Sequence, residues 1–149
     1  MYKKLFIIKI LTICFVLCSS SIAGTSDNFD RGVKLYDKKD FDNSRILFER
    51  DIVFNPKNEN SYLYLAKIFN QSGNEVEEEV NLNNVILLNP KNDEAIYMLT
   101  LIKIKQSNYD EAKKLINNFD LVCKSFCSKK DEMQKKFKKL IPTNEQNKN

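Results

Sequence analysis

The sequence predicts an all-helical protein in which pairs of helices repeat and stack into a solenoid. The tetrapeptide Asn-Pro-Lys-Asn occurs at residues 55–58 and again at 89–92. We call the interval from Asn55 to Asn89 the repeat period. Self-similarity at a fixed period of this size, about 34 residues, is typical of helical-repeat architectures. Apolar residues between the two tetrapeptides recur at helical spacing. The chain of 149 residues also has only three glycines, three prolines and no tryptophan, which favours helices throughout.

Residues 1–23 have the pattern of a cleaved export signal. A positively charged start is followed by an apolar run at 5–18 and by a small-x-small cleavage site before Gly24. The apolar run is shorter than the roughly 20 residues that span a bilayer. We therefore expect cleavage before Gly24 and a periplasmic or secreted protein. The alternatives are a retained anchor and lipidation at Cys14 or Cys18.

The first helix pair is expected within residues 25–58. Gly32 is the small residue at which the two helices are expected to cross, Phe41 begins the second helix, and Ser44 takes its small position. Pro56 ends the pair because proline cannot continue a helix. The apolar residues expected to face the core are Phe29, Val33, Tyr36, Phe48, Ile52 and Phe54.

The second pair is expected within residues 59–92, with Gly73 in its turn. Its expected core residues are Tyr62, Leu65, Ala66 and Phe69 on the first helix and Val76, Val80, Leu82, Val85, Ile86 and Leu88 on the second. Four glutamates between residues 75 and 79 cluster where a helix dipole favours negative charge. Because no histidine or alternating series of oxygen ligands accompanies them, we expect a solvated acidic turn and no metal site.

The third pair is expected within residues 93–126, with Asp93 and Glu94 as anions in its first turn. Its expected core residues are Ile96, Leu99 and Thr100, followed by Tyr109, Ala112, Leu115, Ile116 and Phe119. A capping helix at 128–141 follows, because a solenoid needs a last element with one apolar and one polar face. Its apolar residues are Met133, Phe137, Leu140 and Ile141. Residues 142–149 are expected to be disordered.

The stretch after Asn108, Tyr-Asp-Glu-Ala-Lys-Lys-Leu, resembles the second helix of a tetratricopeptide repeat. It has an aromatic residue, two acids in the first turn, a small residue and then apolar residues. Together with the repeat period, this makes residues 25–122 similar to the tetratricopeptide-repeat family. The resemblance implies a right-handed solenoid of about three helix pairs. It implies binding of a protein or peptide without identifying it, because members of one fold family bind different partners.

The resemblance also places a binding groove on the first helix of each pair. The groove residues would be Phe29, Val33, Tyr36, Leu63, Lys67, Tyr97, Leu101 and Ile104, with Lys67 as the only charge among them. The alternative is that these side chains pack on each other or on the terminal helix. Some heat-shock co-chaperones of this family hold a carboxylate with lysine, asparagine and arginine at positions occupied here by Phe29, Val33, Tyr64, Glu94 and Met98. That clamp is absent.

Two cysteines, Cys123 and Cys127, follow the third pair. They are either a disulfide that joins the last pair to the terminal helix or a redox-active thiol pair. One helical turn is close to the separation that a disulfide tolerates, and no feature of the sequence indicates a lowered thiol pKa. We favour the structural disulfide.

The residue types argue against an enzyme. The sequence has no histidine, the usual acid–base group near neutral pH, and no phosphate loop, dinucleotide fingerprint or zinc-ligand spacing. No cofactor and no nucleic acid partner is expected. Residues 124–149 hold eight lysines against three acids. We interpret these lysines as the solvated face of the terminal helix, and contact of this basic helix with an anionic membrane is the alternative.

We therefore expect an exported, non-enzymatic adaptor that binds a peptide or helix of an envelope protein in its groove. A self-associating scaffold is the second hypothesis. A thiol–disulfide active protein using Cys123 and Cys127 is the third.

Overall fold

A computed structural model of the protein describes residues 27–140, without the side chain of residue 140. The expected signal peptide at 1–23, the expected tail at 142–149, Ile141 and the side chain of Leu140 lie outside this description. None of the helices within it has the length and apolarity of a membrane span.

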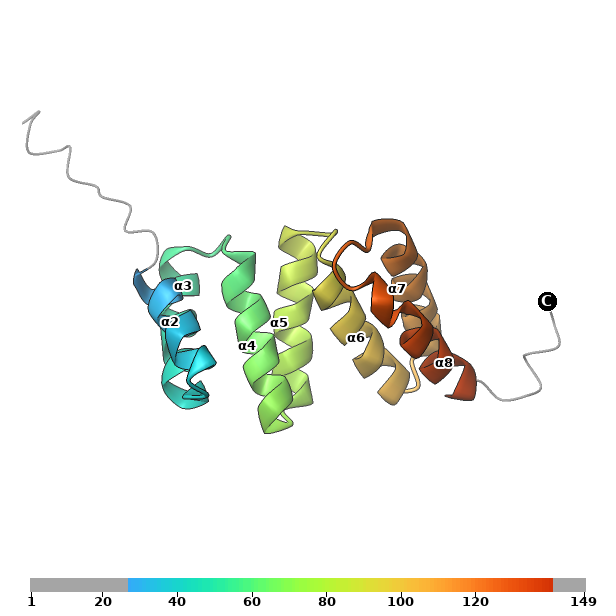
Figure 1. The fold of residues 1–149 in the computed structure, drawn as a ribbon, viewed down its shortest axis with the longest axis horizontal. Coiled ribbons are helices and arrows are strands. Elements are labelled where there is room, and N and C mark those ends of the chain that lie inside the picture. Colours follow the sequence, from blue (N-terminus) through green and yellow to red (C-terminus); the bar gives the residue numbers. More distant parts are fainter. Residues whose placement is uncertain (1–26, 141–149) are drawn as a thin grey trace, which may run out of the picture.

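The described chain is a row of antiparallel helix pairs (Figure 1). The elements are α2 (Asp27–Asp37), α3 (Phe41–Phe54), α4 (Glu59–Ser72), α5 (Glu75–Leu88), α6 (Asp93–Lys105), α7 (Tyr109–Val122), the short 3-10 helix η1 (Cys127–Lys129) and α8 (Lys130–Leu140). The turns within the pairs lie along one edge, and the connections between pairs lie along the opposite edge. No strand occurs in the described part, so the all-helical repeat prediction is confirmed.

Short polar side chains define where most helices begin. The side chains of Asp40, Asn58, Asn74, Asn92 and Asn108 each accept a backbone N–H from the first turn of the following helix. Such caps satisfy donors that have no partner within the helix. At the end of α4, Gly73 has a φ of 73°, a left-handed conformation that glycine adopts without steric cost. The turn predicted at Gly73 is confirmed.

The two helices of the first pair are in close contact at Gly32. A Cβ atom at this position would lie 2.8 Å from a ring carbon of Phe48. Beside it, the Ser44 hydroxyl donates a hydrogen bond of 2.8 Å to the Gly32 carbonyl. The sequence predictions for both small residues are therefore confirmed.

The core consists of two clusters along the row. The first contains Phe48, Leu65, Ile68 and Phe69. The second contains Leu63, Ala66, Leu82, Val85, Ala95, Ile96, Leu99, Ile102, Leu115, Ile116, Phe119 and Met133. The buried residues Leu65, Leu99 and Met133 follow one another at the repeat period. Helix α8, which packs on both α6 and α7, thus lies where the first helix of a fourth pair would lie.

Several expected core residues are exposed instead. Phe54 is 78% exposed, Val76 72% and Val80 49%, and Leu88 is also exposed. These side chains lie on faces of the second helices that no neighbouring helix covers. The buried face of α5 instead contains Glu78 and Asn81 beside Leu82 and Val85.

Candidate functional site

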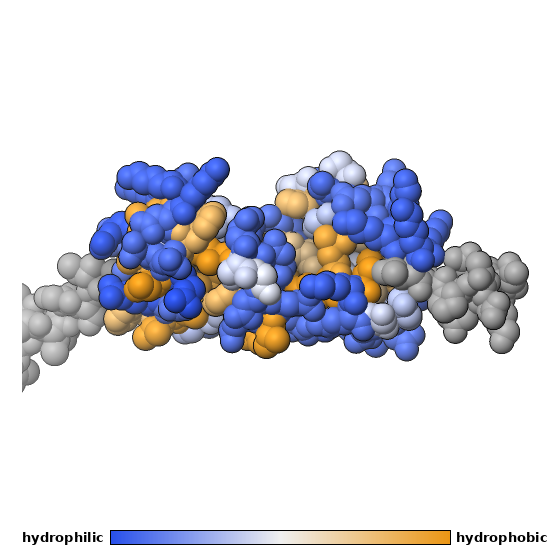
Figure 2. All heavy atoms as spheres, turned by 90° about the horizontal axis from the view of Figure 1, so that it is seen from below, coloured by the Kyte–Doolittle hydropathy of each residue, from blue (hydrophilic) through white to orange (hydrophobic). Residues whose placement is uncertain are grey.

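A row of contacts joins the first helices of the three pairs, and we call it the first-helix surface. The ring of Tyr36 on α2 packs edge-on against Tyr64 on α4, with 5.0 Å between ring centres. The Lys67 ammonium lies 5.3 Å from the centre of the Tyr64 ring. The same ammonium lies 2.9 Å from both carboxylate oxygens of Glu94 on α6. Figure 2 shows a depression in the outline of the molecule between its two ends.

The N-terminal part of this surface is aromatic. Phe29 lies 5.8 Å from Phe48 and 5.9 Å from Tyr64, measured between ring centres. Phe29, Val33 and Tyr36 are partly buried against the first core cluster. The pKa of the Tyr36 hydroxyl is raised, mainly by burial and to a smaller extent by the nearby Tyr64 and acidic groups. Phe29, Val33 and Tyr36 therefore form an uncharged, partly buried part of the first-helix surface.

Lys67 is not the single charge that the sequence suggested. Its ammonium is neutralised by Glu94, 27 residues later on the neighbouring first helix. It also faces the electron-rich side of the Tyr64 ring, a favourable position for a cation. Lys67 therefore bridges two helices, and its charge is not available as a separate anchor.

The C-terminal part of the first-helix surface is a cavity of about 350 Å³. It is lined by Asn70, Glu75, Glu78, Glu94, Tyr97, Met98, Leu101, Ile102, Lys105 and Phe126. Three glutamates and one lysine contribute charge, and aromatic and aliphatic side chains supply the rest. Of the predicted groove residues, Tyr97 and Leu101 lie here. We call this hollow the acidic cavity.

Glu78 is a buried acid at the edge of the acidic cavity. Its side chain is 5% exposed, and one carboxylate oxygen accepts a 3.0 Å hydrogen bond from the Asn70 amide. Burial raises the pKa of Glu78, and the hydrogen bond from Asn70 offsets this only in part. Glu78 follows Ser44, the small residue of the first pair, by one repeat period, which is why its side chain lies between helices.

Two more of the glutamates at the start of α5 are bound to α6. Glu75 pairs with Lys105, and Glu79 pairs with Lys103. The Gln106 amide donates to both carboxylates, at 3.2 and 2.8 Å. Hydrogen bonds from the lysines lower the pKa values of Glu75 and Glu79. The expected solvated acidic turn is therefore wrong for Glu75 and Glu79, which link two neighbouring repeats, whereas Glu77 is exposed.

Two predicted groove residues belong to the interior. Leu63 is 7% exposed and Ile104 is 4% exposed. The first helix of an inner pair has neighbours on two sides, so Leu63 turns into the second core cluster. Ile104 only borders a second hollow of about 350 Å³ between Leu101 and the lysines of α8.

A larger hollow of about 560 Å³ lies elsewhere, near the turns within the first two pairs. Its lining includes Lys39, Arg45, Asp40 and Asp42, so positive and negative charges are mixed there. Within residues 27–140, no cluster of histidine, cysteine, aspartate and glutamate is arranged to hold a metal ion.

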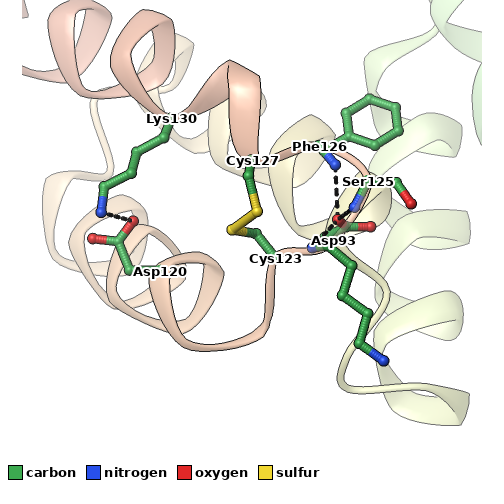
Figure 3. The surroundings of a disulfide bond; sticks show 8 residues. Asp93, Asp120, Cys123, Ser125, Phe126, Cys127 and Lys130 are labelled. Carbon is green, nitrogen blue, oxygen red and sulfur yellow. Dashed lines mark hydrogen bonds and ion pairs between the residues drawn. A yellow bond between two sulfur atoms is a disulfide. The ribbon is translucent and has the colours of Figure 1, made fainter.

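Figure 3 shows a short loop after α7, which contributes Phe126 to the lining of the acidic cavity. One carboxylate oxygen of Asp93 accepts the backbone N–H groups of Lys124, Ser125 and Phe126, at 2.7, 2.7 and 2.9 Å. Burial raises the pKa of Asp93, but these three hydrogen bonds outweigh it and hold the pKa below its usual value. The sequence indicated Asp93 only as an acid at a helix start. Its bonds to the loop had no signal in the sequence.

The same loop brings Phe126 against the first-helix surface. The ring centres of Phe126 and Tyr97 are 6.0 Å apart, and the Tyr97 hydroxyl donates to Glu132 of α8 at 3.4 Å. At the ends of the loop, the Cα atoms of Cys123 and Cys127 are 5.2 Å apart, and Figure 3 draws their sulfur atoms joined. That separation is within the range of disulfides.

We predict that Cys123 and Cys127 are joined by a disulfide in the native protein. Because the bond closes a loop of only a few residues, replacing Cys123 with serine should lower the free energy of unfolding by about 1–3 kcal/mol. Alkylation of denatured, unreduced protein followed by mass measurement checks the pairing. Two alkylated cysteines would contradict the structural disulfide.

Comparisons with known proteins agree on the fold. No family model matches the sequence, and no curated protein matches it. Among solved structures, the Arabidopsis OM64 TPR domain has a TM-score of 0.67 at 18% identity, over 76% of this chain and 93% of that one. The first TPR of Spaghetti (RPAP3), bound to the HSP90 peptide SRMEEVD, has a TM-score of 0.66 at 16% identity, over 76% and 90%.

A chain of the CopN–Scc3 complex is also similar, with a TM-score of 0.62 at 17% identity over 72% of this chain. This chain spans 65% of the length of that one. At such low identity the similarity establishes the fold alone. The described helices have the fold of a tetratricopeptide-repeat domain.

Proposed function

We propose that the protein is a non-enzymatic adaptor that holds a peptide or helix of another envelope protein on its first-helix surface. The observation that carries this proposal is the acidic cavity, where glutamates surround Tyr97, Met98, Leu101 and Phe126. A cavity with apolar walls and a few polar groups is the usual form of a binding site. The structural neighbour Spaghetti, which holds a peptide, supports the same use of the fold.

The charges favour a partner that carries a basic residue beside an apolar one. Glu75, Glu78 and Glu94 line the cavity, and Lys105 is the only cation among the lining residues. Glu75 already pairs with Lys105, and Glu94 already pairs with Lys67. The lining acid that forms none of the ion pairs of the described residues is Glu78, which a basic residue of a partner would meet. Opposite charges across an interface determine orientation and exclude wrong partners. An acidic peptide end, such as the one bound by Spaghetti, would meet glutamates here.

Two further parts of the proposal come from the sequence. The absence of histidine supports a binding role without catalysis. The signal pattern of residues 1–23 supports export to the periplasm or the medium, and a mature mass beginning at Gly24 is the expected observation. Chemical crosslinking in the native envelope followed by capture of the protein would identify the partner.

The chemistry of the site can be tested before the partner is known. We expect peptides selected by the full-length protein from a random display library to be enriched in lysine or arginine beside leucine or an aromatic residue. The same peptide synthesised with glutamate in place of each basic residue is the control. Equal binding of the two peptides, or enrichment of acidic peptides, would contradict the proposed partner class.

Replacing Tyr97 with alanine should weaken binding of a selected peptide by about 2 kcal/mol, or roughly thirtyfold, because a few aromatic side chains carry most interface energy. The control is Leu121→Ala, because Leu121 is 85% exposed on a second helix. This substitution should leave binding unchanged. Melting temperatures of both variants should be measured alongside. A large drop in melting temperature for Tyr97→Ala with unchanged binding would show that Tyr97 is a packing residue.

A further inference from the structure

The connections between helix pairs all lie along one edge of the row (Figure 1). Together with the last two residues of each second helix, η1 and the first residue of α8, they comprise residues 53–58, 87–92 and 121–130. We call these stretches the connection edge. These stretches contain five lysines and no aspartate or glutamate, and the acids that border them directly are Glu59, Asp93, Asp120 and Asp131. The opposite edge, which Figure 2 faces, contains both signs of charge around its turns, including Lys39 beside Asp40 and Asp42.

Large apolar side chains are exposed along the connection edge at the repeat period. Val53, Leu87 and Leu121 are 75, 79 and 85% exposed, and each follows the one before it by a single repeat period. Phe54, beside the first of them, is 78% exposed. Single exposed apolar residues are ordinary. Here, however, the last turn of the second helix of every pair carries such a residue, so that the exposed side chains form a row. Packing within the described chain does not explain this row.

Three of the five lysines of the connection edge are also available for contact, because only Lys129 and Lys130 form ion pairs. Within the described residues, Lys57, Lys91 and Lys124 form none of the ion pairs. The nearby carboxylate of Asp93 is occupied by three backbone N–H groups, and that of Asp120 pairs with Lys130 at 3.1 Å. Each helix pair therefore has an exposed apolar side chain at the end of its second helix and a lysine without an ion pair in the connection that follows.

We propose that the connection edge docks on a bilayer containing anionic phospholipids. Apolar side chains that enter the headgroup region, flanked by lysines that contact anionic headgroups, are the physical requirements for interfacial binding. A second copy of this chain is a poorer occupant, because two such edges facing each other would bring lysines together. The residues of the first-helix surface other than Phe126 lie outside this edge, so docking leaves that surface free for a partner.

The absence of tryptophan from the sequence allows a local test in the full-length protein. Phe54→Trp introduces one fluorophore on the connection edge. Val76→Trp introduces one at a similarly exposed site, 72% against 78%, at the start of α5 near the opposite edge. With vesicles of brominated phosphatidylglycerol and phosphatidylcholine, we expect quenching in the Phe54→Trp protein and little in the Val76→Trp protein. Vesicles of brominated phosphatidylcholine alone should quench neither.

Charge removal then tests the lysines. In the Phe54→Trp background, replacing Lys57, Lys91 and Lys124 with glutamine should weaken association of the edge on the order of a hundredfold, since each lysine near an anionic surface contributes about fivefold. A control with Lys34, Lys38 and Lys113 replaced, all exposed and away from the connections, matches the change in net charge. Equal losses in the two triple variants would overturn the proposal.

Two other results would also overturn it. Equal quenching at both tryptophan sites would mean that the N-terminal segment brings the protein to the vesicle without engaging this edge. Absence of quenching together with self-association that disappears in a Val53→Asn, Leu87→Asn, Leu121→Asn variant would assign the edge to a second copy of the chain.

Discussion

Replacing Phe48 with alanine should lower the free energy of unfolding by about 3–5 kcal/mol, the usual cost of removing a buried phenylalanine. The Phe48 side chain is fully buried. It stacks on Tyr64 with 4.9 Å between ring centres and contacts Gly32 so closely that no Cβ fits between them. Its removal would leave a cavity where α2, α3 and α4 meet.

The same helix supplies a matched control. Phe54 is 78% exposed, so Phe54→Ala removes the same chemical group from water and should change stability by less than about 0.5 kcal/mol. Urea unfolding of the two variants, followed by the helical signal, measures both values. A comparable loss in the two variants would mean that Phe54 has a packing partner outside the described residues.

The difference between Phe48 and Phe54 shows what helical spacing can predict. The two residues are six positions apart, which places them on different faces of a helix with 3.6 residues per turn. The contacting face of α3 also contains Ser44 and Asp51. An apolar pattern predicts that a helix packs against a neighbour. Where the second helix of a pair has apolar residues on two faces, the sequence does not indicate which of the two faces the neighbour covers.

The fold was predictable because its determinants are local or periodic. Gly32 defines where the helices of the first pair cross, and Gly73, Pro56 and Pro90 define where helices end. The repeat period defines how the pairs stack. Contacts between repeats were not predictable in the same way. Lys67 and Glu94 are 27 residues apart in the sequence. A lysine and a glutamate at that distance are not recognisable as an ion pair until the stacking of the helices is known.

The candidate site was predicted in part for the same reason. Positions taken from the family resemblance led to Tyr97 and Leu101, which line the acidic cavity. Leu63 is buried because the solenoid covers more of an inner first helix than those positions implied. Phe126 was missed because its position depends on a loop attached through backbone groups, which any residue possesses.

That attachment is the basis of the second large effect. Replacing Asp93 with alanine should lower the free energy of unfolding by about 3 kcal/mol, because hydrogen bonds to a charged group contribute about 1.5–3 kcal/mol each and water replaces part of the loss at this half-exposed loop. The amides of Lys124, Ser125 and Phe126 should exchange hydrogen faster. Phe126 should then leave Tyr97, and binding of a selected peptide should weaken.

Asp110→Ala is the control, since Asp110 lies in the first turn of α7 and is exposed. It loses only the helix-dipole interaction, about 0.3–1 kcal/mol. Unchanged exchange of the three amides in the Asp93→Ala protein would show that the loop is held by the cysteine pair and α8 without Asp93.

The same carboxylate should make stability depend on pH. The pKa of Asp93 is lower in the folded protein than in the unfolded chain, through its three backbone hydrogen bonds. Its stabilising contribution is therefore complete above the unfolded pKa, near 4, and is lost as the pH falls through the folded value. We expect the stability difference between the unsubstituted protein and Asp93→Ala to be largest at neutral pH and to shrink on acidification. A difference that stays constant between pH 7 and pH 2 would assign the effect to packing, since a protonated Asp93 no longer offers a charged acceptor to the loop.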